Sequence, residues 1–147
     1  MQTPAPDAFL NNLMLYLLAR ATSQASAPMH EQVRKHGLSV PEWRTLMTIA
    51  DTPRTIGDLA ALLLMKQPTL TRILDRMEQA GLIRRKSDPK DGRRVLAALT
   101  ARGEALAQDL IPMALAYDAD LLKSYSSEEA ETLKEALRVL IDRTAAV

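Results

Sequence analysis

The sequence predicts a mainly α-helical fold of the α+β kind, with six helices and one β-hairpin. Two observations support this prediction. Apolar residues recur at the spacing of amphipathic helices before residue 55 and after residue 100. Between these segments, two short helical patterns are followed at 82–99 by two runs typical of strands. A chain of 147 residues can form one well-cored domain, or one domain with an oligomerisation element.

The first helix is predicted from an apolar stripe near the N-terminus. Its members share one helical face: Leu10, Leu13, Met14, Leu17, Leu18 and Ala21. We expect Pro28 to kink this helix or to restart it, with Ser26 as a new cap. Gly37 is the expected stop of the second piece.

The next two helices are predicted from their caps. Ser39-Val-Pro-Glu42 is a capping box with proline in the first turn, and Thr55-Ile-Gly-Asp58 places a threonine cap before an acid. The apolar residues expected to face inward on these two helices are Trp43, Leu46, Met47, Ile56, Leu59, Leu62 and Leu63.

Pro68 fits the first turn of a fourth helix, which Gly81 should end. Its inward face is predicted to hold Leu70, Ile73, Leu74 and Met77. Polar residues then face outward, and they include Gln67, Thr69, Thr71, Arg72, Asp75 and Arg76.

Residues 82–86 and 94–99 are the two predicted strands, around a turn at 87–92 rich in turn formers. We expect the tip of this hairpin to project. Thr100 is a predicted cap for a fifth helix ending near Lys123 and bent at Pro112. Ser126-Ser-Glu-Glu129 is a second capping box, which opens the last helix.

The net charge of +1 hides a strong asymmetry along the chain. Residues 66–94 contain nine basic and four acidic residues, a net charge of +5, whereas residues 103–147 contain four basic and nine acidic residues, a net charge of −5. One basic and one acidic region suit a polyanionic partner on one side. A solvated charged face is the alternative explanation.

The third and fourth helices together form a predicted helix-turn-helix, whose second helix could enter a major groove. Glutamine pairs with adenine, and arginine binds guanine or phosphate. The basic hairpin would be a wing, with Arg84, Arg85 and Lys86 on one arm, Lys90 at the tip, and Arg93 and Arg94 on the other arm. We expect Asp91 to hold the Arg93 guanidinium, and Asp88 to cap the turn.

Residues 38–103 resemble the MarR/SlyA family of winged helix-turn-helix regulators. The resemblance is carried by these segments: Leu38-Ser-Val-Pro-Glu-Trp43, Gly57-Asp-Leu-Ala60, Pro68-Thr-Leu-Thr-Arg72, Asp75-Arg-Met-Glu78, Gly81-Leu-Ile-Arg-Arg85, Asp88-Pro-Lys-Asp-Gly-Arg93 and Leu99-Thr-Ala-Arg-Gly103. It implies a homodimer that binds double-stranded DNA at a pseudo-palindromic operator, more often as a repressor. The implied DNA-binding residues are Gln67, Pro68, Thr69, Thr71, Arg72 and Arg76 on the recognition helix, and Lys86, Lys90, Asp91, Arg93 and Arg94 on the wing.

We therefore expect an α+β winged helix-turn-helix domain at 38–100, with 8–37 and 101–146 forming a helical region that dimerises through the N- and C-terminal helices. These helices carry apolar stripes with little sequence to bury them. A bundle within one chain is the alternative.

A small aromatic acid, or its acyl thioester, is the effector that the resemblance implies. Candidate ligand-binding residues are Asn11, Asn12, Tyr16, Arg20, Trp43 and Tyr117, with Arg20 as the natural partner of a carboxylate. Packing or dimer contacts would explain the same residues.

Other functions are disfavoured by the sequence. It has no cysteine, which excludes a thiol switch, and His30 and His36 lie about 240° apart around a helix, which does not suit a metal site. We expect no enzyme activity, no cofactor and no metal, because no nucleophile–base pair, phosphate loop or HExxH motif occurs. No apolar run approaches the ~20 residues of a membrane span, and MQTPAPDAF does not look like a signal peptide, so the cytoplasm is expected. A winged-helix module that binds protein without DNA is the remaining alternative.

Overall fold

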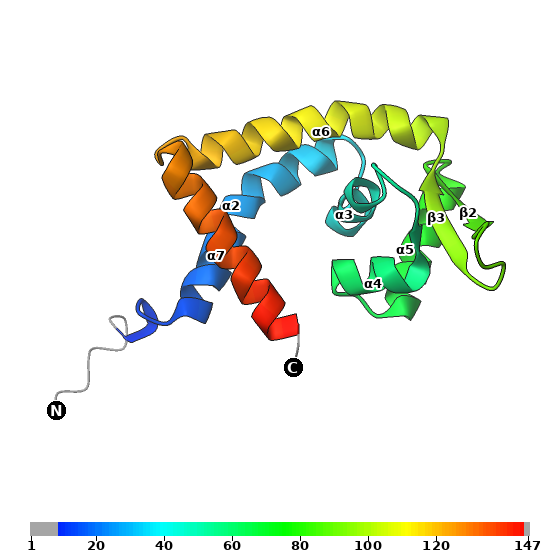
Figure 1. The fold of residues 1–147 in the computed structure, drawn as a ribbon. Coiled ribbons are helices and arrows are strands. Elements are labelled where there is room, and N and C mark those ends of the chain that lie inside the picture. Colours follow the sequence, from blue (N-terminus) through cyan, green and yellow to red (C-terminus); the bar gives the residue numbers. More distant parts are fainter. Residues whose placement is uncertain (1–8, 146–147) are drawn as a thin grey trace. The chain divides into compact units, whose positions relative to one another are not determined.

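A computed structural model describes residues 9–145 of the chain, which form six helices and a small antiparallel sheet (Figure 1). The helices are α2 (Met14–Lys35), α3 (Val40–Thr48), α4 (Ile56–Leu63), α5 (Gln67–Gln79), α6 (Ala101–Leu122) and α7 (Ser127–Ala145). The strands are β1 (Arg54–Thr55), β2 (Ile83–Ser87) and β3 (Val95–Leu99). The predicted fold class is confirmed.

Local capping explains where several helices begin, as predicted. Before α3, the Glu42 amide donates to Ser39 Oγ at 3.3 Å, and the Ser39 amide donates to Glu42 Oε2 at 2.8 Å. Ser126 and Glu129 make the same reciprocal pair before α7, at 2.7 and 3.2 Å. Such side chains satisfy amides that have no partner within the helix. The sequence therefore determines these helix starts through contacts between close neighbours.

Helix α2 differs from its prediction at both Pro28 and its start. It is a single helix that contains Pro28, so the predicted restart at Ser26 is wrong. A proline inside a helix costs about 3 kcal/mol. Met29 and Val33, which follow it, are buried, and this packing compensates for the lost hydrogen bond. The helix begins at Met14 after a turn at Leu10–Leu13, so Leu10 precedes it.

The core of residues 38–110 is apolar and closely follows the predicted inward faces. Five leucine side chains in it are fully buried: Leu46, Leu59, Leu70, Leu74 and Leu110. Leu62 is an exception, because it is exposed, whereas the prediction placed it inside. All of α4 except Gly57 and Asp58 is apolar, so the neighbours decide which face is buried, and Ala60 is buried instead.

The sheet has the order β1-β3-β2, with both pairs antiparallel. The hairpin β2–β3 has a regular register from Ile83 opposite Leu99 to Ser87 opposite Val95. Its strands start one residue later than predicted. The two-residue strand β1 pairs Arg54 with Ala97 and was not predicted, because so short a segment has no alternation to detect.

The chain divides into two compact units at Pro112, inside α6. The close approach of α6 to the backbone just before β2 explains Gly103: a Cβ atom there would lie 2.0 Å from the Leu82 carbonyl oxygen. Thr100 caps α6 as predicted, since its Oγ1 accepts from the Gly103 amide at 3.1 Å.

None of the helices in residues 9–145 has the length and apolar character needed to cross a membrane.

Candidate nucleic-acid interface

Helices α4 and α5 form the predicted helix-turn-helix. Helix α4 ends at Leu63 and is followed by Leu64, whose backbone is left-handed (φ 55°), and α5 begins after Lys66 with Pro68 in its first turn. The left-handed residue turns the chain sharply, as a C-terminal glycine usually does. The turn leaves the first turn of α5 exposed beside α4 (Figure 1).

All six predicted recognition-helix residues are exposed: Gln67, Pro68, Thr69, Thr71, Arg72 and Arg76. The opposite face of α5 is buried through Leu70, Ile73, Leu74 and Met77. The Thr71 hydroxyl donates to the Gln67 carbonyl oxygen at 2.9 Å. Arg76 forms an ion pair with Glu42 of α3 at 3.5 Å. The polar face of α5 is therefore available for a partner, with Arg76 partly held by the protein.

The loop of the hairpin is organised by two aspartates. Asp88 Oδ1 accepts from the Lys90 amide at 2.9 Å, which confirms the expected cap. Asp91 Oδ1 accepts from the Arg93 amide at 3.1 Å. Asp91 thus fixes the backbone of Arg93, and the expected contact with its guanidinium is absent among the described residues.

The four basic wing residues predicted to bind DNA are exposed, and the loop that carries three of them lies at the outer edge of the winged helix-turn-helix (Figure 1). These residues are Lys86, Lys90, Arg93 and Arg94. Arg94 is close to Asp58 of α4, with 3.4 Å between Nη2 and Oδ2. Both line a shallow hollow with Gln67, so one wing residue and the first residue of α5 face the same space. Wing and recognition helix therefore border one common hollow on the surface.

Arg85 has a role that was not predicted from the sequence. Its guanidinium binds Asp75 and Glu78 of α5, and these hydrogen bonds from Arg85 hold the pKa of the Glu78 carboxyl below its ordinary value of 4.5. The same contacts raise the pKa of Arg85, with Glu78 the larger cause. Asp75 and Glu78 lie three residues apart on one helical face, which is a signal for such a pair. In the sequence, Arg85 is hidden within a basic run.

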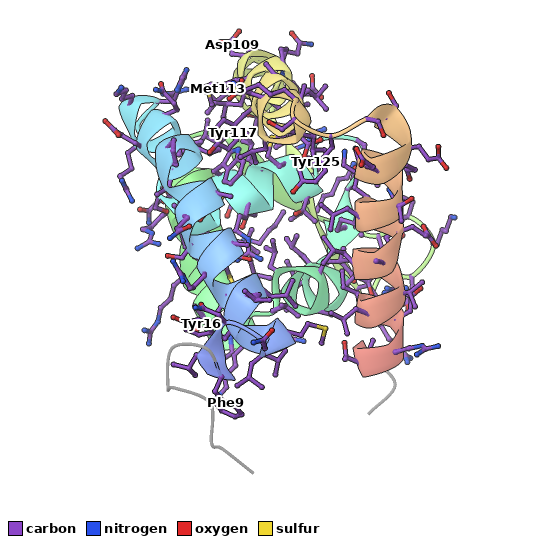
Figure 2. The ribbon with its side chains drawn as sticks, turned by 90° about the vertical axis from the view of Figure 1, so that its left-hand side faces the viewer. Phe9, Tyr16, Asp109, Met113, Tyr117 and Tyr125 are labelled. Carbon is purple, nitrogen blue, oxygen red and sulfur yellow. The ribbon has the colours of Figure 1, made fainter. Side chains whose placement is uncertain are left out.

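Three of the candidate effector residues lie close together. Arg20 Nη1 lies 3.5 Å from Asn11 Oδ1, and the Arg20 guanidinium lies over the Tyr16 ring at 5.7 Å. Trp43 instead contacts His30 edge to face at 6.2 Å, and its buried Nε1 has no hydrogen-bond partner in the described structure. Figure 2 shows Tyr16 on α2 and Tyr117 on α6. Tyr117 belongs to the unit that follows Pro112.

These features define the class of protein: a winged helix-turn-helix with an exposed recognition helix and a basic wing. Residues 36–94 match the MarR family. The chain is 30% identical to the HTH-type transcriptional regulator MhqR of Bacillus subtilis, over 85% of this chain and 87% of that protein. It is 32% identical to the homoprotocatechuate degradative operon repressor of Escherichia coli, over 66% of each.

Solved structures agree with this relationship. A MarR family transcriptional regulator from Silicibacter pomeroyi is 40% identical and superposes with a TM-score of 0.83, covering 92% of this chain and 98% of that one. The MepR–DNA complex of Staphylococcus aureus shares the fold at 22% identity, with a TM-score of 0.76 over 89% and 98% of the chains. The chain belongs to the MarR family of transcriptional regulators.

Proposed function

We propose that the protein is a homodimeric, sequence-specific DNA-binding repressor. A small aromatic acid, or its acyl thioester, would release it from a pseudo-palindromic operator in the cytoplasm. The observation that carries this proposal is that the polar face of α5 and the basic wing are both exposed and border one common hollow. The E. coli relative named as an operon repressor supports the mode of action.

DNA recognition divides between two elements. Gln67, Thr69, Thr71 and Arg72 on the first half of α5 would contact base edges and phosphates in the major groove. Arg93 on the wing, with its backbone held by Asp91, would enter the minor groove, where narrow A·T-rich segments attract arginine. Lys86, Lys90 and Arg94 would contact phosphates, and Pro68 would fix the start of the recognition helix.

Dimerisation is supported by the apolar side chains left exposed on α2 and α7. Leu13, Met14 and Leu17 near the start of α2 are exposed, and so are Leu133, Leu137 and Ile141 along α7. Pairing two subunits through residues 8–37 and 101–146 would bury these side chains and space the two 38–100 domains by about one DNA turn, ~34 Å.

The effector proposal rests on charge and on an unpaired donor. Arg20 is an exposed cation beside an aromatic ring, an arrangement that suits an aromatic carboxylate. Trp43 has a buried indole N–H that a ligand acceptor could satisfy. Asn11 and Tyr16 adjoin Arg20 and complete this group, whereas Tyr117 is a separate candidate in the unit after Pro112. A ligand releases DNA only if it prefers the conformer that cannot bind DNA.

The first experiment measures binding of the protein to DNA from upstream of its own gene by fluorescence anisotropy at several salt concentrations. We expect tight binding that weakens steeply as salt rises, because phosphate contacts release counterions. The Arg93→Ala variant should bind about 1–3 kcal/mol more weakly while it remains folded. No salt-dependent binding by wild type would favour a protein-interaction module instead, and unchanged affinity of the variant would remove the minor-groove role of Arg93.

The second experiment titrates a panel of aromatic acids and their acyl thioesters into the protein–DNA complex. At least one should release the DNA, and Arg20→Ala should raise the concentration required. If no compound in the panel releases DNA, the proposed effector class is wrong.

A further inference from the structure

A single arginine ties the hairpin to the recognition helix. Arg85, the central residue of β2, donates to Glu78 Oε2 from Nε at 3.1 Å and from Nη2 at 2.7 Å. Nη2 also donates to Asp75 Oδ1, and the Arg85 backbone amide donates to Glu78 Oε1 at 2.9 Å. Both carboxylates belong to α5. Strand and helix are therefore joined through side chain and main chain together.

The other ion pairs around the interface are looser. Arg94 approaches Asp58 at 3.4 Å and Arg76 approaches Glu42 at 3.5 Å, each through one contact. The Arg85 side chain is 27% exposed, compared with 50% for Arg94 and 61% for Arg76. Exposed single-contact pairs contribute little, whereas a partly buried arginine with several charged partners keeps a fixed geometry.

The position of Arg85 in its strand separates it from the other basic residues of the wing. Side chains alternate between the two faces of a strand. Ile83 and Arg85 share a face, with Ile83 buried and Arg85 half-buried, whereas Arg84 and Lys86 are exposed. The Arg85 guanidinium binds two carboxylates of its own chain, so it is not available to bind DNA phosphates.

We propose that Arg85, Asp75 and Glu78, here called the wing clamp, are positioning residues for DNA binding. The clamp holds β2 and β3 against α5, so that the Arg93 loop and the recognition helix reach the same duplex together. This inference rests on the proposed DNA-binding function and adds to it residues that do not themselves contact DNA.

The clamp and simple electrostatics predict opposite effects for the same substitution. Glu78 is a negative charge on the helix proposed to enter the groove, so its removal should, through charge alone, strengthen binding to DNA. If Glu78 positions the wing, its removal loosens β2 and weakens binding, because the wing must be re-ordered on the duplex. We expect a loss of roughly 3- to 10-fold, the size of the effect of immobilising a few side chains.

The test compares Glu78→Gln with Glu104→Gln. Glu104 is an exposed acid in the first turn of α6, outside the clamp, and its substitution changes the net charge equally. Glu78→Gln should weaken binding to the upstream DNA, whereas Glu104→Gln should leave it equal or slightly tighter. Circular dichroism verifies that both variants fold, and Asp75→Asn, also expected to weaken binding, is the second variant if Glu78→Gln does not fold.

A double-mutant cycle with Arg93→Ala then tests whether the clamp acts through the wing. Arg93→Ala should weaken binding by a smaller factor in the Glu78→Gln background than in wild type, because a displaced wing has already lost part of that contact. Equal factors in the two backgrounds, or clamp variants that bind as tightly as wild type, would overturn the inference. Wild type that binds no DNA would instead contradict the proposed function itself, and the clamp's role with it.

Discussion

Apolar side chains are buried in the core of residues 38–110 but remain exposed on helix α7. In the core, Leu46, Leu70 and Leu74 are completely buried. In α7 no described residue is buried, and Leu137 and Ile141 remain 37% and 62% exposed. Both segments have amphipathic patterns, so the pattern alone does not tell which stripe is covered by the same chain.

The difference indicates two sources of stability. The core gains its stability from contacts within one chain, so its outward face can remain polar and is the surface that we propose for DNA recognition. The stripe on α7 would leave apolar surface in water in a single chain, which is unfavourable at about 25 cal/mol per Å². A second subunit is the partner that we propose for it.

The largest effect is expected from a core substitution. Leu74→Ala should lower the free energy of unfolding by about 2–5 kcal/mol, because it leaves a cavity in a site with no exposed surface. Leu62→Ala, at the exposed leucine of α4, is the matched control and should change it by less than about 0.5 kcal/mol. Urea unfolding of both variants measures the contrast. Similar losses would mean that Leu62 is covered.

A charged substitution on α7 tests whether a second subunit covers its apolar stripe. Leu137→Asp should shift the protein from dimer towards monomer in sedimentation at micromolar concentration, because burying an unpaired carboxylate costs about 2 kcal/mol or more. Far-ultraviolet circular dichroism should change little, since no residue of α7 is buried in one chain. The control Leu62→Asp should remain a dimer. A dimer that tolerates Leu137→Asp would exclude this stripe from the interface.

The pH dependence of the unfolding free energy tests the contact between Glu78 and Arg85 in the wing clamp. The folded pKa of Glu78 is lowered by Arg85, so its contribution to stability is present above the unfolded value of 4.5 and is lost as pH falls through the folded value. Wild type should therefore exceed Glu78→Gln in unfolding free energy near neutral pH. The difference should narrow at acid pH, as measured by urea unfolding from about pH 7 to about pH 3. If the difference in unfolding free energy between wild type and Glu78→Gln does not change with pH, packing and not the charge of Glu78 is its cause.

The smallest effect concerns the turn between α4 and α5. Leu64 is 89% exposed and left-handed, a conformation that glycine adopts without strain. Leu64→Gly should raise the free energy of unfolding by about 0.5 kcal/mol, after the greater flexibility of glycine in the unfolded chain is deducted. Thermal unfolding measures this gain. A lower melting temperature would show that the Leu64 side chain contributes contacts despite its exposure.

Features set by neighbouring residues were predictable from the sequence. The capping pairs at Ser39 and Ser126 and the left-handed glycines Gly37 and Gly81 depend on a few adjacent residues. The hairpin was also predictable, because its two strands are joined by a short loop with clear turn formers. The exposed face of α5 followed from assigning its apolar residues inward.

Features that depend on distant contacts were not predictable. The pairing of Arg54 with Ala97 joins residues far apart in the chain. The continuation of α2 through Pro28 reflects the burial of Met29 and Val33. Arg85 looked like its basic neighbours, and only the packing of β2 on α5 reveals its carboxylate partners. Neighbouring elements likewise decide whether Leu62 or Ala60 is buried.

Sedimentation of the complex with its upstream DNA tests the central claim most directly, because it counts how many chains bind one duplex. Two copies of the recognition surface paired by α2 and α7 should place two chains on each operator, with no complex of one chain at intermediate protein concentrations. Leu137→Asp should abolish this complex or weaken it strongly. A stable complex of a single chain with the duplex would contradict the claim that α2 and α7 pair two chains so that both recognition surfaces bind one operator.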